Sequence, residues 1–152
     1  MTAVVLAACG ALVALWLWVR RRLVVVTVEG PSMEPALRDG DRVLVRRVPL
    51  PEVRAGQVMV ARRPSPPGQP EDAGPWLVKR VVAVGGDPVP AEVRAAVDAR
   101  DDRVPHGCLV VLGDNRARSA DSRHWGYITA EHLLGVVHRG MSPGTPGGPV
   151  NA

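Results

Sequence analysis

One hydroxyl group stands at a stiff corner of the chain, in the stretch EGPSMEPALRDGDRVLV over residues 29–45. Ser32 lies between Pro31 and Pro35, at a place where a turn by itself needs no serine. A serine hydroxyl becomes a strong nucleophile when a neighbouring base removes its proton. The sequence therefore predicts Ser32 as a nucleophile, provided that the chain supplies a base.

Histidine is the usual base for such a serine, and the chain contains four histidines, His106, His124, His132 and His138. Three of them lie near no obvious partner motif, and His124 is expected in a loop beside Trp125. No G-x-S-x-G nucleophile elbow occurs in the sequence. A Ser-His-Asp triad nevertheless stays open as an alternative, because counting histidines does not decide between bases.

Lys79 is the only lysine of the chain and lies within the apolar run WLVKRVVAV, residues 76–84. In a strand, Lys79 and Arg80 face opposite sides, so one of them points inward. Arginine keeps its proton, whereas a buried lysine can lose it. A general base near neutral pH needs a pKa of about 7–8 instead of about 10.4. Taken alone, Lys79 fits an exposed residue on an edge strand better than a general base.

Short β-branched runs separated by Gly and Asp turns make up most of the remaining sequence, which favours an antiparallel β domain that curls on itself. The predicted strands are 23–28, 41–48, 57–61, 76–84, 108–112 and 134–138. We expect a loop over 64–75 and either one short helix or a loop over 90–103. Residues 140–152 are rich in Gly, Pro and Ser and predict a flexible tail.

The N-terminal residues 2–19 carry no charge and predict one transmembrane helix. Eighteen helical residues span about 27 Å, close to the thickness of a bilayer core. Arg20, Arg21 and Arg22 follow this segment and nearly account for the net charge of +4. A juxtamembrane cluster explains this charge better than a nucleic-acid surface does. By the positive-inside rule, the arginines favour a cytoplasmic location for the residues that follow.

Three stretches, GPSMEPALRDGDRVLV, VKRVVAVGGDPV and GDNRARSADSRHWG, resemble three sequence boxes of type I signal peptidases and occur in the same order. With the N-terminal segment, the resemblance extends to about Gly140. It implies Ser32 as nucleophile and Lys79 as general base. It further implies that Ser119 orients the lysine amine and that Asp121 and Arg123 form a supporting charged pair.

The resemblance also implies roles next to the nucleophile. Met33 is expected to line the pocket for the residue before the cleavage site. Gly30 stands where some members of the family carry a hydroxyl residue that donates to the oxyanion. The oxyanion hole is therefore expected to use backbone N–H groups at Ser32 and near Gly30. No cofactor is implied, and no His or Cys spacing suggests a metal site.

The expected fold is mainly β, with a curled catalytic domain of the signal peptidase type over 23–139 behind the transmembrane helix. The function implied is that of a monomeric, membrane-bound serine endopeptidase that removes N-terminal signal peptides from exported preproteins, after small residues. Its partners would be the preprotein and the lipid bilayer, with no nucleic acid. Single-span members of the family place the catalytic domain outside the cytoplasm, which conflicts with the arginines.

Three alternatives remain open from the sequence. The region between the Lys79 box and the GDN box is short, which suits a maturation protease dedicated to one or a few secreted peptides. A LexA-like self-cleaving regulator also uses a Ser-Lys pair on a similar β domain, but no DNA-binding helix pair precedes the β domain here. A membrane-anchored binding module would leave both Ser32 and Lys79 idle.

Overall fold

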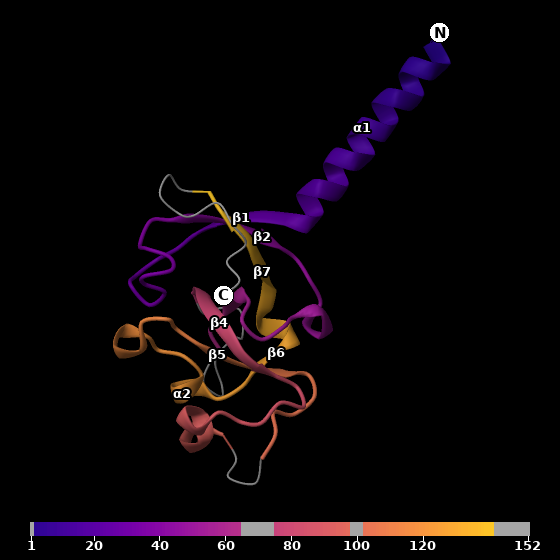
Figure 1. Ribbon diagram of the computed structural model, residues 1–152. Coiled ribbons are helices and arrows are strands. Elements are labelled where there is room, and N and C mark those ends of the chain that lie inside the picture. The colour runs from indigo at the N-terminus through magenta and orange to yellow at the C-terminus, as the bar shows by residue number, and fades with distance from the viewer. Residues whose placement is uncertain (1, 65–74, 98–101, 142–152) are drawn as a thin grey trace.

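A projecting helix and a body built on one sheet make up the computed structural model, which describes residues 2–64, 75–97 and 102–141. Helix α1 (Thr2–Arg22) extends away from the body and leads directly into the first strand (Figure 1). Most of the predicted loop over 64–75 and of the predicted tail over 140–152 lies outside the described residues.

Within the described residues, the sheet contains seven strands in the order β1-β2-β7-β3-β4-β5-β6, and every neighbouring pair is antiparallel. Register shifts interrupt the pairs β2–β7, β3–β7 and β4–β5, and such irregularities bend a sheet. The mainly β, antiparallel and curled fold is therefore confirmed. The strands are β1 (Leu23–Thr27), β2 (Arg42–Arg46), β3 (Val58–Arg62), β4 (Trp76–Val84), β5 (Cys108–Leu112), β6 (Ile128–Thr129) and β7 (Leu133–Gly140).

Valine and leucine side chains fill the core, as the scarcity of aromatic residues requires. In β2, the buried Val43 and Val45 alternate with the exposed Arg42 and Arg46, the pattern of a strand with one covered face. Strand β3 is buried at four successive residues, so both of its faces are covered. The lysine-bearing strand β4 pairs with β3 and therefore lies deep in the body.

Several short elements complete the connections. They are η1 (Leu50–Glu52), η2 (Ala91–Ala96), η3 (Arg116–Arg118), α2 (Ser122–Trp125) and η4 (Ala130–His132). The predicted short helix within 90–103 is present as the 3-10 helix η2. Strand β6 and helix α2 were not predicted, because two and four residues are too few to show a periodic pattern.

Helix α1 covers the segment for which we predicted a transmembrane helix. In the described part of the chain, no helix combines the length and the apolar character that a membrane crossing requires. The transmembrane helix over 2–19 therefore stays a prediction.

Candidate active site

Strand β4 carries Lys79 into the interior, so that only 4% of the residue is exposed. Its cross-strand neighbour is the buried Met59, and its Nζ donates a hydrogen bond to Ser119 Oγ at 2.9 Å. Burial lowers the pKa of Lys79; the charge of Asp121 opposes this shift, and the charge of Arg123 adds to it. The environment of the amine thus shifts its equilibrium toward the neutral form, which can accept a proton.

Ser119 links the amine to a buried carboxylate. Its Oγ donates to Asp121 Oδ2 at 2.8 Å, and the Gly113 N–H donates to the same oxygen at 3.0 Å. Arg123 donates from Nε to Oδ1 at 2.8 Å and from Nη2 to Oδ2 at 3.0 Å. Burial alone would raise the pKa of Asp121, but these hydrogen bonds outweigh it and lower the pKa to about 2. A fixed negative charge therefore lies one hydroxyl group away from Lys79.

Arg123 also folds the loop that presents Ser119. Its Nη2 donates to the carbonyl oxygens of Arg116 at 2.8 Å and Ser119 at 3.2 Å. Asp121 caps helix α2, since its side chain accepts the Arg123 N–H while His124 Nδ1 accepts the Asp121 N–H. The segment S-A-D-S-R, residues 119–123, is thus held in place by hydrogen bonds among its own charged side chains and backbone groups.

Ser32 lies half-buried in the turn between β1 and β2, and its carbonyl oxygen accepts the Asn115 N–H at 3.0 Å. Ser32 and Ser119 both border Gly113. A Cβ at Gly113 would lie 2.2 Å from Ser119 Oγ and 2.6 Å from the Ser32 carbonyl oxygen. The backbone of the predicted nucleophile and the partner of Lys79 therefore lie beside the same glycine, which leaves no room there for a side chain.

The Gly30 N–H, which lies next to the expected oxyanion hole, donates to Asp39 Oδ1 at 2.7 Å. A second backbone donor near Gly30 stays a prediction. The Ser32 N–H has no hydrogen-bond partner within the described residues and is available. Gly30 itself adopts a φ of +78°, which explains why a glycine stands there.

Met33 follows the nucleophile but points into the body. It is fully buried and packs in the core cluster with Val28, Leu37 and Val43. Its predicted contact with a substrate side chain stays a prediction.

The sequence matches the protein family "Signal peptidase, peptidase S26" over residues 1–97 and 91–140. The chain belongs to this signal peptidase family. The resemblance seen in the three sequence boxes is thereby confirmed.

Curated relatives agree with this membership. The "Probable signal peptidase I-1" of Synechocystis is 32% identical over 132 residues, which cover 71% of this chain and 65% of the relative. The "Mitochondrial inner membrane protease subunit 1" of Xenopus tropicalis is 31% identical over 115 residues, covering 74% and 65%. The "Signal peptidase I" of Bacillus caldolyticus is 28% identical over 143 residues, covering 72% and 74%. The chain thus spans 65% of the length of the first two relatives.

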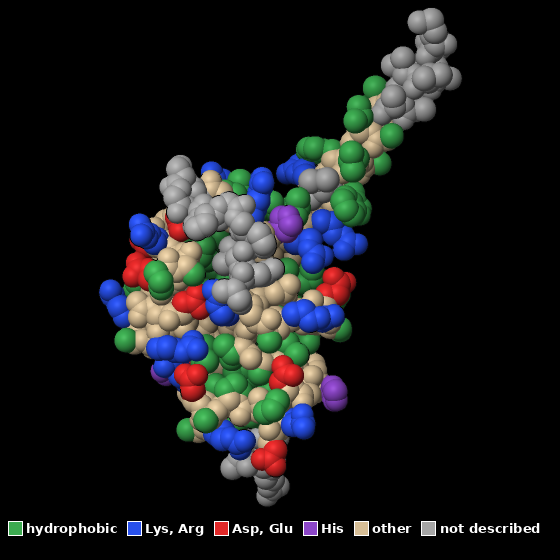
Figure 2. All heavy atoms as spheres, in the orientation of Figure 1, with side chains coloured by type: hydrophobic (Ala, Val, Ile, Leu, Met, Phe, Trp, Pro, Cys, Tyr) green, Lys and Arg blue, Asp and Glu red, His purple; other side chains and the backbone are tan. Residues whose placement is uncertain are grey.

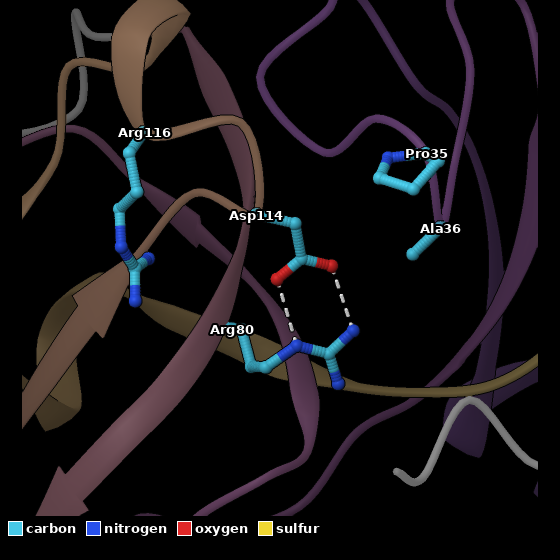
Figure 3. Close-up of a pocket in the computed structure, with 5 residues that line it drawn as sticks. All are labelled: Pro35, Ala36, Arg80, Asp114 and Arg116. Atoms are coloured by element: carbon cyan, nitrogen blue, oxygen red, sulfur yellow. Dashed lines mark hydrogen bonds and ion pairs between the residues drawn. The ribbon is translucent and has the colours of Figure 1, made fainter.

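An ion pair that the sequence analysis missed lies next to this site in the signal peptidase fold. Arg80 donates from Nε to Asp114 Oδ1 at 2.8 Å and from Nη2 to Oδ2 at 2.7 Å, while Nη1 donates to the Gly56 carbonyl. Figure 3 shows the pair in an open pocket, with Pro35 and Ala36 on the opposite wall. The pair ties β4 to the loop that carries Asn115. The sequence does not reveal this pair, because Arg80 and Asp114 lie 34 residues apart in the chain.

The choice between a lysine and a histidine base stays a prediction. Within the described residues, neither Lys79 nor any of the four histidines forms a hydrogen bond with Ser32. His132 instead lies 2.8 Å from the Thr129 hydroxyl, and His124 belongs to the cap of α2. The described residues also contain no group of three or more His, Cys, Asp or Glu side chains that could hold a metal ion.

Proposed function

We propose that this member of the signal peptidase family is a membrane-bound serine endopeptidase that removes N-terminal signal peptides from exported preproteins. Ser32 is the nucleophile and Lys79 is the general base. The observation that carries the proposal is the buried Lys79 amine, which is hydrogen-bonded to Ser119 beside Gly113, the glycine that the Ser32 carbonyl also borders. The names of the relatives, signal peptidases and an inner membrane protease, support the same reaction class.

In the first half of the reaction, neutral Lys79 accepts the proton of Ser32 Oγ as this oxygen attacks the scissile carbonyl carbon. The carbonyl oxygen becomes an oxyanion, and the Ser32 N–H is the donor available to it. The lysine ammonium then gives its proton to the leaving amine, and the C–N bond breaks. The products are the free mature N-terminus and an ester between the signal peptide and Ser32.

In the second half, a water molecule attacks the ester carbonyl and Lys79 accepts its proton. The tetrahedral intermediate collapses, Ser32 Oγ leaves, and Lys79 returns the proton to it. Ser119 keeps the amine directed through both halves, because its hydroxyl accepts one N–H of Lys79 and donates to Asp121. Lysine thus alternates between base and acid while Asp121 stays ionised.

The substrate proposed is an extended peptide with small residues at the first and third positions before the scissile bond. It would lie between the segment before Ser32 and the part of β4 before Lys79, pairing with the backbone as an added strand. A membrane-held enzyme meets a membrane-held signal peptide in two dimensions, which raises the effective concentration.

The membrane anchor proposed is α1, as a single span with the catalytic domain outside the cytoplasm. The arginines after α1 argue for the opposite orientation. A protease-protection assay on vesicles of known sidedness decides between the two. Digestion of the catalytic domain only from the cytoplasmic side would reject an exported catalytic domain.

The peptidase function is tested with two variants. Ser32→Ala and Lys79→Ala should each abolish cleavage of a synthetic signal peptide substrate while the purified proteins keep their circular dichroism spectrum. Full activity in either folded variant would remove the Ser-Lys mechanism. A panel of unrelated signal peptides then separates a general peptidase from a dedicated maturation protease. The short connection from β4 to β5 favours the dedicated protease.

A further inference from the structure

Arginines gather where α1 meets the sheet. Arg20 and Arg22 end the helix, while Arg46 and Arg47 stand at the end of β2. The two ends are joined, since the Arg47 N–H donates to the Arg22 carbonyl at 2.8 Å and Arg46 is the cross-strand partner of Leu23. We call these four arginines the basic collar. Figure 2 shows basic side chains around the base of the projecting helix.

The basic collar carries little compensating negative charge. Within the described residues, its only carboxylate partner is Glu52, which lies 3.6 Å from Arg46 with both side chains about half exposed. An exposed pair of this kind is weak. Arg20 and Arg22 instead lie over the rings of Trp16 and Trp18, at 4.6 and 5.9 Å from the ring centroids. The guanidinium groups therefore remain open to an anionic partner.

Apolar side chains continue directly from the basic collar along α1. Leu12, Leu15, Trp16 and Trp18 are each more than half exposed. Val25, on the outer face of β1, is 41% exposed. A nucleic acid would match the charge of the collar but not this aliphatic surface. Tryptophan and arginine beside aliphatic residues match a bilayer surface, where aromatic rings lie at headgroup level and arginine binds phosphate.

We infer that the basic collar binds the phosphate groups of anionic lipids, so that one end of the sheet is held against a negatively charged membrane surface. This interaction goes beyond the proposed peptidase activity, because it needs neither Ser32 nor Lys79. It specifies a lipid class, which an apolar helix alone would not select. Each basic residue near an anionic membrane surface strengthens binding about fivefold.

The experiment compares the binding of the full chain to two kinds of vesicle. Vesicles of phosphatidylcholine alone and vesicles that also contain phosphatidylglycerol are floated with the protein, and the ratio of the two partition coefficients is measured. Because α1 contributes its apolar binding energy to partition into both kinds of vesicle, this contribution cancels in the ratio. The double variant Arg46→Gln/Arg47→Gln should lower the preference for phosphatidylglycerol by about 25-fold. High salt should lower it in the parent protein as well.

The matched control is Arg94→Gln/Arg103→Gln, which removes the same charge from other exposed sites. Residues 91–97 lie at the end of the body opposite α1 in Figure 1. This control should keep the full lipid preference, and cleavage of a soluble peptide should be unchanged in both double variants. If the first double variant does not fold, Arg47→Gln alone, with an expected fivefold loss, gives the answer.

Equal partition of the parent protein into both vesicle types would overturn the inference. So would a preference that survives the loss of Arg46 and Arg47, or one that falls equally in the control.

Discussion

Asp121 and Arg123 pair with each other but act on Lys79 with opposite sign. The carboxylate raises the pKa of Lys79, and the guanidinium lowers it, in addition to the larger lowering by burial. Because Lys79 must be neutral to act as a base, activity should rise as the pH passes the lysine pKa. The two partners thus offer a way to move the pH profile in either direction.

We expect Asp121→Asn to move the acidic limb of kcat/KM to lower pH and Arg123→Gln to move it to higher pH. The first change removes the charge that stabilises the ammonium form, and the second removes the charge that destabilises it. The measurement is kcat/KM as a function of pH, with His132→Gln as the control that leaves the limb in place. Shifts in the same direction for both variants would contradict the assignment of Lys79 as the titrating base.

Ser119→Ala should reduce kcat by about 100-fold and change KM much less. The Ser119 hydroxyl contacts the lysine amine and Asp121, and its removal leaves the amine without its orienting partner. Steady-state kinetics on a peptide substrate measure both constants. A variant that changes only KM would instead place Ser119 in peptide binding.

The individual site residues could be predicted from the sequence, but not all of their interaction partners could. Alternation in β4 required either Lys79 or Arg80 to point inward, and the family boxes pointed to Ser119, Asp121 and Arg123. These roles stay predictions until they are tested by activity. The bond from Gly30 to Asp39 could not be predicted, because it depends on how a turn folds back across nine residues.

At the scale of the elements, the loop after β5 brings the site together. Gly113 follows the last residue of β5, donates its N–H to Asp121 and borders both Ser32 and Ser119. The next residues hold the Ser32 carbonyl through Asn115 and bind β4 through Asp114. The position of the nucleophile therefore depends on this loop as well as on its own turn.

Gly113→Ala should abolish most of the activity and lower the free energy of unfolding by about 1–3 kcal/mol. The added methyl group would meet Ser119 and the Ser32 carbonyl below contact distance, so one of them must shift. Urea unfolding and kcat/KM measure the two effects. Gly10→Ala is the control, since a Cβ there meets nothing within 4 Å. Normal activity in the Gly113 variant would show that the site tolerates this shift.

The long strands were predictable, whereas the elements that shape the site were not. Alternating or continuously apolar runs bounded by Gly and Asp marked the strands from β1 to β5 and β7. The pairing of β7 with both β2 and β3 carries no local signal, because it joins residues far apart in the sequence. Helix α2 depends on the cap by Asp121, which is itself held by Arg123.

At the scale of the whole molecule, Asp121 links the site to stability in acid. Its pKa is about 2 in the folded state and 3.8 as an unperturbed group, so the unfolded chain binds its proton first as the pH falls. The contribution of this group is complete above about pH 4 and is lost as the pH falls through about 2. It should amount to roughly 2 kcal/mol.

Urea unfolding between pH 5 and pH 2 should show a steeper loss of stability in the parent protein than in Asp121→Asn. The variant lacks the titrating group and should be less stable at pH 5, with the difference shrinking toward pH 2. Asp102→Asn, at an exposed side chain, serves as the control and should follow the parent curve. Parallel curves for the parent and Asp121→Asn would show that this carboxylate does not set the acid limit.

Strand β7 is the last of the described strands in the sequence, yet it lies inside the sheet, between β2 and β3. During synthesis, the β1–β2 hairpin with Ser32 and the strands around Lys79 must therefore wait for residues 133–140 to leave the ribosome. Only then can the two halves share a sheet, and such late, long-range pairing is slow. A nascent chain that lacks β7 consequently has no assembled nucleophile and base, so the proposed protease becomes competent only after β7 has been synthesised.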